Sequence, residues 1–144
     1  RRQRQMCIRD RILSLIILIL SDSRPLVEVE INGRPAVMLV DTGSSTGLID
    51  INQMDEYGFS LMAKTDMVIS SIGGKRCESY RVRDLWVRLE GISIYQFLAT
   101  DISLIAESIY KETGYRISGI IGYDQIKNAE IKIDASNNQI KIGN

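Results

Sequence analysis

The sequence contains no histidine in its 144 residues. This absence excludes Ser-His-Asp and Cys-His catalysis, histidine metal sites and acid–base chemistry by imidazole. Cysteine is scarce as well, because Cys7 and Cys77 are too few and too far apart to form a zinc site. We therefore expect no metal and no cofactor. Any chemistry must come from carboxylates, hydroxyls and lysines.

The chain also lacks net charge and long apolar runs. Its 18 basic and 18 acidic residues cancel, so nothing indicates a nucleic-acid partner. The longest apolar-rich stretch, residues 12–20, is too short to span a bilayer. An apolar content of 44% and a charged content of 25% are typical of a globular protein. The length corresponds to one domain with a proper core.

The amino-terminal residues differ from the rest of the chain. Residues 1–11 hold five arginines and one aspartate, and we interpret them either as a non-native stretch or as a disordered basic tail. We interpret residues 12–24 as the remnant of a secretion signal or anchor, because an apolar core follows basic residues. The alternative is a buried terminal strand. The first interpretation predicts membrane association through residues 12–20 and a secreted, periplasmic or membrane-anchored location in a bacterium. Residues 25–144 would then form the folded domain.

The pattern of apolar residues predicts a mainly β domain. Residues 26–31 alternate with period two, and the pair Asn32-Gly33 predicts a tight turn into a returning strand over residues 35–40. Further strands are predicted over residues 65–71, 76–83, 84–89, 92–99, 118–121, 130–134 and 139–142. Trp86 is interpreted as a core or sheet-face aromatic.

Two or three short helices complete the prediction. Asp50 is expected to cap a brief helix that ends at Gly58. Residues 102–113 have apolar side chains at helical spacing. Residues 123–128 are expected to form a short helix, with Asp124 capping it or bonding locally.

The most informative segment is an apolar strand, residues 37–40, that stops at Asp41-Thr42-Gly43. A buried strand would hold the following loop rigidly and place the Asp41 carboxyl at the edge of the core. A carboxylate in such a place is costly unless it is hydrogen-bonded or paired. Catalytic acids are built in this way.

A second unusual segment, Gly119-Ile120-Ile121-Gly122, lies near the other end of the chain. Two apolar residues between glycines indicate a backbone that packs very close to another element. Together, the two segments resemble the retropepsin-like aspartic proteases. That resemblance covers residues 25 to 143 and implies a single closed β-barrel or sandwich lobe with a mobile flap hairpin.

The resemblance also implies a role for each matching residue. Asp41 would be the catalytic acid, Thr42 would bond across to a partner loop, and Gly43 would let the backbone approach the carboxylates. Ser44 would hydrogen-bond the outer oxygen of Asp41. The remaining matches are the flap residues Ile72, Gly73 and Gly74 and the loop-supporting residues Ile120, Ile121 and Gly122.

The sequence supplies only one Asp-Thr-Gly. Peptide hydrolysis by this chemistry needs two adjacent carboxylates, so the resemblance implies a homodimer in which two copies of Asp41 meet across a twofold axis. The expected partners are a second copy of the chain and a peptide or protein substrate. Two alternatives stay open: a catalytically silent peptide-binding module of the same fold, and a non-enzymatic β domain in which Asp41-Thr42-Gly43 is an ordinary turn.

Overall fold

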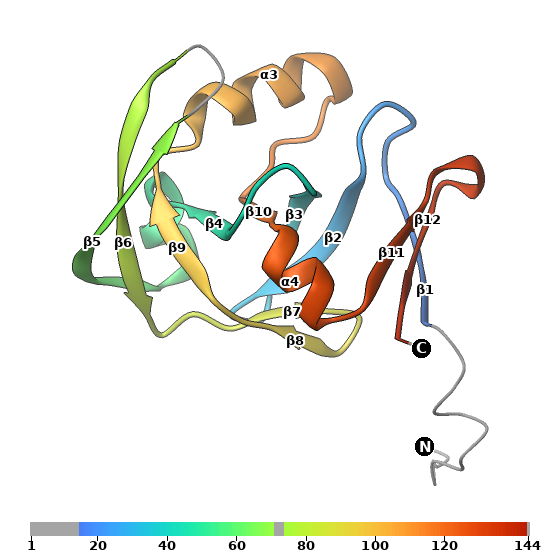
Figure 1. Ribbon diagram of the computed structural model, residues 1–144, viewed down its shortest axis with the longest axis horizontal. Helices are drawn as coiled ribbons and strands as arrows, with labels where there is room; N and C mark the ends of the chain where they lie inside the picture. The colour runs from blue at the N-terminus through green and yellow to red at the C-terminus, as the bar shows by residue number, and fades with distance from the viewer. Residues whose placement is uncertain (1–14, 71–73, 144) are drawn as a thin grey trace, which may run out of the picture.

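The computed structural model describes residues 15–70 and 74–143, which form two sheets and five helical segments (Figure 1). The larger sheet has the order β5-β6-β9-β4-β10-β3-β2-β7-β8, and the smaller has the order β1-β12-β11. The strands of the larger sheet are β2 (Leu26–Ile31), β3 (Arg34–Val40), β4 (Gly47–Asp50), β5 (Ser60–Ser70), β6 (Arg76–Arg83), β7 (Val87–Leu89), β8 (Ile92–Ile94), β9 (Phe97–Thr100) and β10 (Gly119–Ile121). The strands of the smaller sheet are β1 (Leu15–Leu18), β11 (Ile131–Asp134) and β12 (Gln139–Ile142).

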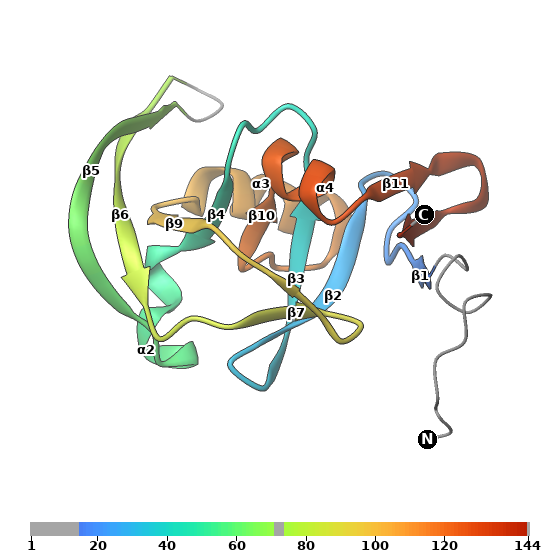
Figure 2. The ribbon, with the colours of Figure 1, turned by 60° about the horizontal axis from the view of Figure 1, so that its bottom comes forward.

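The predicted mainly β class is confirmed, but the sheet is open among the described residues. Its order is linear, and β5 and β8 lie at its two ends. Figure 2 shows β5 and β6 curving away from β2 and β3, so that the sheet encloses part of its own core. The predicted closed barrel is therefore replaced by a strongly curved sheet.

The β2–β3 hairpin follows from its turn residues. Asn32 and Gly33 have φ angles of 50° and 83°, as a two-residue turn between twisted strands requires. The register pairs Leu26 with Leu39, which sends β3 through the core and delivers Asp41 at its end. This part of the sequence prediction is confirmed.

The helices begin and end largely where the sequence predicts. Asp50 accepts a hydrogen bond from the Asn52 amide at the start of η1 (Ile51–Gln53), and Gly58 ends α2 (Met54–Tyr57) in a left-handed conformation. The helix α3 (Ser103–Thr113) buries Ala106 and Ile109. The fourth segment, α4 (Tyr123–Asn128), follows β10 directly, and a short 3-10 turn, η2 (Ala135–Asn137), joins β11 to β12.

The core consists of two clusters on opposite faces of the large sheet. One cluster lies between the sheet and α3 and consists of Leu26, Leu39, Leu48, Ile102, Ala106, Ile109, Ile117 and Ile120. The larger cluster includes Met38, Val40, Ile49 and Ile121. Because neighbouring residues in a strand point to opposite faces, β3, β4 and β10 are buried on both sides.

Several predicted boundaries are wrong for identifiable reasons. The strand predicted to start at residue 65 begins at Ser60. The strand predicted over residues 92–99 divides into β8 and β9, because Gln96 has a φ of 73°. The strand predicted over residues 84–89 is only Val87–Leu89, and Asp84 before it has a φ of 61°. Trp86 is 64% exposed and is therefore not a core residue.

The terminal sheet contains part of the segment for which two interpretations were open. Strand β1 pairs antiparallel with β12, and Ile17 and Ile140 lie opposite each other, buried in the larger core cluster. The described part of this segment therefore includes a strand, Leu15–Leu18. Residues 1–14 lie outside the described part. Within residues 15–70 and 74–143, no helix has the length and apolar character needed to cross a membrane.

Candidate active site

The Asp41 loop is fixed to its neighbouring strand by the backbone. Strand β10 runs parallel to β3 and pairs Ile121 with Val40. The next amide, that of Asp41, donates to the Ile121 carbonyl at 2.9 Å. The Gly43 amide donates to Asp41 Oδ1 at 2.8 Å, so the carboxylate is oriented by its own loop. Asp41 is half-buried, as the sequence predicts for a carboxylate at the edge of the core.

Two glycines of the loop-supporting segment allow very close packing. A Cβ added to Gly122 would lie 2.3 Å from the Thr46 carbonyl oxygen, and one added to Gly119 would lie 2.5 Å from the Leu48 carbonyl oxygen. No side chain fits at such distances. The Tyr123 amide also donates to the Ser44 carbonyl at 2.7 Å. Strand β10 and the start of α4 therefore support the Asp41 loop from beneath.

The buried side chain of Gln125 reinforces this support, and sequence reasoning did not identify it. Its Oε1 accepts from the Gly122 amide at 2.9 Å, and its Nε2 donates to the Tyr95 carbonyl at 2.7 Å. This residue, rather than the predicted Asp124, bonds the free amide at the start of α4. Its position, three residues after Gly122, is where a capping glutamine belongs. That spacing is the signal that could have identified it.

The Ser44 hydroxyl does not bond the outer oxygen of Asp41 as predicted, although the Ser44 amide donates to the Asp41 carbonyl at 3.2 Å. Ser44 Oγ donates to the Thr46 carbonyl at 2.8 Å. The reason is local, because a serine hydroxyl readily bonds a backbone group two residues away. The side chain therefore holds the loop in shape. Thr42, by contrast, is exposed in the single chain.

Asp41 opens into a hollow of about 190 Å³ between the loop, the β5–β6 hairpin and the start of α3. Its lining residues are Asp41, Gly43, Ser44, Leu48, Ile69, Ser70, Cys77, Asp101, Ile102, Ile105 and Ile120. The walls are thus mainly aliphatic. The thiol of Cys77 is free and buried. An apolar hollow beside an oriented carboxylate suits an apolar side chain of a ligand.

The second carboxylate of the hollow, Asp101, is held in its ionised form. It accepts hydrogen bonds from the Ser103 amide and from Asn52 Nδ2, both at 2.9 Å. Lys75 Nζ lies 3.3 Å from its Oδ2. These hydrogen bonds, those from Ser103 foremost, hold the pKa of Asp101 well below its usual range. Asp50 binds the same asparagine, but burial raises the pKa of Asp50.

The Lys75–Asp101 ion pair connects the tip of the hairpin to the body of the domain. Lys75 follows Gly74, which is exposed and has a φ of 81°. Gly74 therefore sits in a turn at the hairpin tip, as predicted. The other two predicted flap residues, Ile72 and Gly73, lie outside the described residues.

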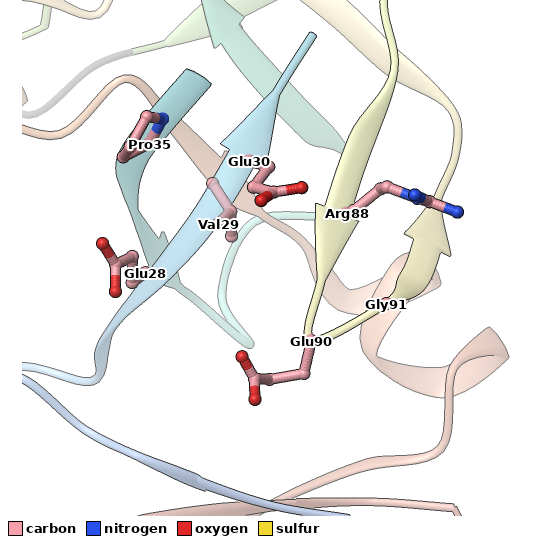
Figure 3. A pocket seen from close by; sticks show the side chains of 7 residues that line it. All are labelled: Glu28, Val29, Glu30, Pro35, Arg88, Glu90 and Gly91. Atoms are coloured by element: carbon pink, nitrogen blue, oxygen red, sulfur yellow. The ribbon is translucent and has the colours of Figure 1, made fainter. Parts of the chain in front are cut away.

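A second concavity lies away from the Asp41 loop and has a different character. It is lined by Glu28, Val29, Glu30, Pro35, Arg88, Glu90 and Gly91. Figure 3 shows its charged side chains spreading outward rather than converging on one point. Within residues 15–70 and 74–143, no group of three or more cysteine or acidic residues could hold a metal ion. The charged side chains of this second concavity therefore form an ordinary solvated surface.

Comparison with known proteins agrees with the geometry of the Asp41 loop. Residues 27–125 match the family model described as aspartyl protease. The chain belongs to the aspartyl protease family. The match covers more than half of the chain and includes both the Asp41 loop and the supporting strand β10. No curated protein matches the sequence.

Two solved structures of retroviral-protease type share the fold of this chain. EIAV protease complexed with the inhibitor HBY-793 is similar with a TM-score of 0.54 and 22% identity, over 76% of this chain and 90% of that one. The retroviral protease-like domain of Ddi1 from Leishmania major is similar with a TM-score of 0.56 and 18% identity, over 90% and 94% of the two chains. At these identities the likeness concerns the fold. The resemblance inferred from the two sequence segments is confirmed for the family by the matching family model and for the fold by these two structures.

Proposed function

We propose that this protein is an aspartic endopeptidase that acts as a homodimer. The observation that carries the proposal is the Asp41 loop. It presents one carboxylate, oriented by the Gly43 amide, on a rigid support and at the mouth of an apolar hollow. One such loop supplies half of the machinery that the chemistry needs.

The chemistry requires a base to activate water and an acid to protonate the carbonyl oxygen of the peptide. Two carboxylates held within a few ångströms of each other cannot both ionise readily, so they retain one proton between them. The pair then titrates as a unit. A second copy of Asp41, brought close by a twofold axis, provides the missing carboxylate.

The neighbouring residues are suited to this arrangement. The exposed Thr42 side chain is available to bond the partner's loop, and Gly43 leaves room beside the carboxylate. An alanine Cβ there would lie 3.2 Å from Asp41 Oδ1. The β5–β6 hairpin, which lines the same hollow through Ile69 and Cys77, would act as the flap over the substrate.

The substitution Asp41→Asn tests the proposal. We expect it to abolish cleavage of an unstructured protein at acid pH while the circular dichroism spectrum stays unchanged. Asp55→Asn, which changes an exposed carboxylate in α2, is the matched control and should cleave normally. Undiminished cleavage by Asp41→Asn would refute the proposal. A wild-type protein that binds such a chain without cutting it would instead be the silent peptide-binding module.

A further inference from the structure

A groove of about 700 Å³ lies next to the active-site region, between strands β6 and β9. These strands pair at only two positions, Tyr80 with Ala99 and Arg81 with Leu98. Beyond Arg81 they separate, as Figure 1 shows for the stretch below their contact. The space between them is open to solvent and lined by side chains from both strands and from β5.

The groove carries exposed apolar side chains of unusual size. Trp86 and Tyr95 are 64% and 71% exposed, and Met62 and Met67 on β5 are also exposed. All four line this one groove. Isolated apolar residues on a surface need no explanation, but a group of aromatic and methionine side chains in one concavity marks a site of interaction.

The backbones that carry the two aromatic residues are held in place. Asn32 Oδ1 accepts from the Trp86 amide at 2.7 Å, and the Asn32 amide donates to the Trp86 carbonyl at 2.8 Å. The Tyr95 carbonyl accepts from the buried Gln125, which also bonds Gly122 of the loop-supporting segment. Exposed aromatic rings on a fixed backbone lose little conformational freedom when they bind a partner.

The sheet register connects the groove to the Asp41 hollow. Leu98 lies beside Leu48 of β4, and Leu48 lies beside Ile120 of β10. Leu98 lines the groove, whereas Leu48 and Ile120 line the hollow. Thr46 of the active loop also lines the groove. The two concavities are therefore neighbours along one row of side chains on the same sheet.

This register sets the length of a bound peptide that would reach from the Asp41 hollow to the groove. The row from β10 to Arg81 on β6 crosses three strand spacings, which is roughly 14 Å. An extended peptide covers that distance with about four residues. A residue bound in the groove would therefore lie about four to six positions from the bond that is cut.

We infer that the groove is a binding site for a distal segment of the substrate polypeptide, in which an aromatic side chain packs between Trp86 and Tyr95. The inference rests on the proposed proteolytic function. Arg81 lines the groove and makes no ion pair with any other residue of the described ranges. It is thus available to an acidic neighbour of that aromatic residue. The protein would accordingly prefer long, unfolded substrates to short peptides.

The test compares two peptides with the same central sequence. One extends three residues to each side of the cleaved bond, and the other extends eight, with phenylalanine at the fifth position on both sides. In the double variant Trp86→Ala/Tyr95→Ala, we expect KM for the long peptide to rise about tenfold, as for the loss of anchor residues at an interface. The kcat for both peptides and the KM for the short one should not change. Tyr110→Ala, which removes an exposed aromatic from α3, is the control.

Binding separates this inference from the proposed function. In the Asp41→Asn background, a fluorescently labelled long peptide should bind, and the double variant should weaken that binding about tenfold even if no peptide is ever cut. If the wild-type protein cuts neither peptide, the proteolytic function fails, while the binding difference still supports the groove. Equal binding by the parent and the double variant, or an equal rise in KM for both peptides, would overturn the inference.

Discussion

The Asp41 loop and the β5–β6 hairpin line the same hollow, yet they are built in opposite ways. The loop is held by buried backbone contacts, with the Gly122 Cα so close to Thr46 that no side chain fits. The hairpin is exposed along nearly all of β5, and its register is interrupted twice, between Leu61 and Lys64 and between Lys64 and Val68.

The difference shows that one part of this small domain holds the carboxylate in position, while another part controls the access of substrate to it. A catalytic carboxylate must be held in place before the substrate arrives, which favours tight packing and paired backbone groups. A covering hairpin must be able to move, which favours few buried contacts and local pairing. If this contrast is correct, equivalent changes in the two regions should have very different costs.

A glycine substitution in each region gives the largest expected contrast. Gly122→Ala forces a Cβ against the Thr46 carbonyl oxygen, so we expect a loss of about 3 kcal/mol in the free energy of unfolding and the loss of activity. In Gly74→Ala the added Cβ meets no atom within 4 Å. The free energy of unfolding should therefore fall by only about 1 kcal/mol, the cost of a left-handed backbone at alanine. Urea denaturation measures both. Equal losses would remove the contrast between loop and hairpin.

The contribution of Asp101 to stability, which comes mainly from its hydrogen bonds with Ser103, should depend on pH. The pKa of Asp101 is lowered in the folded state, so its contribution to stability is complete above the ordinary aspartate pKa and is lost as the pH falls below it. Asp101→Asn should therefore lower the free energy of unfolding by about 1 kcal/mol at pH 6. The difference from the wild type should shrink progressively below about pH 4. A difference that does not change with pH would contradict this role.

The smallest effect is expected at Ser44. Because its hydroxyl bonds the Thr46 carbonyl, Ser44→Ala should cost about 1 kcal/mol of stability and leave the pH profile of cleavage unchanged. A role in stabilising the charge on Asp41 would instead displace the acid limb of that profile. The pH dependence of kcat/KM distinguishes the two roles.

Sequence reasoning succeeded where local signals and long-range packing agree. The Asn32-Gly33 turn, the Asp50 cap and the apolar face of α3 each follow from a few neighbouring residues. The apolar strand before Asp41 and the paired glycines around Ile120 and Ile121 predicted the supporting arrangement in the same way.

The failures occur where tertiary contacts override local preference. The left-handed backbone at Asp84 and Gln96 interrupts two predicted strands. Neither residue type predicts a left-handed conformation at its position. The Gln125 side chain bonds Tyr95, 30 residues away in sequence, and no local pattern specifies that contact. Trp86 lies in the connection between β6 and β7 and lines the groove instead of the core, a position that the sequence around it does not specify.

The most direct test is the rate of cleavage per chain, measured over a range of protein concentrations alongside analytical ultracentrifugation. The homodimeric site predicts that the rate per chain falls on dilution, in step with the conversion of dimer to monomer. A monomer that retains the full rate per chain would contradict the account, because a single Asp41 would then suffice for the chemistry.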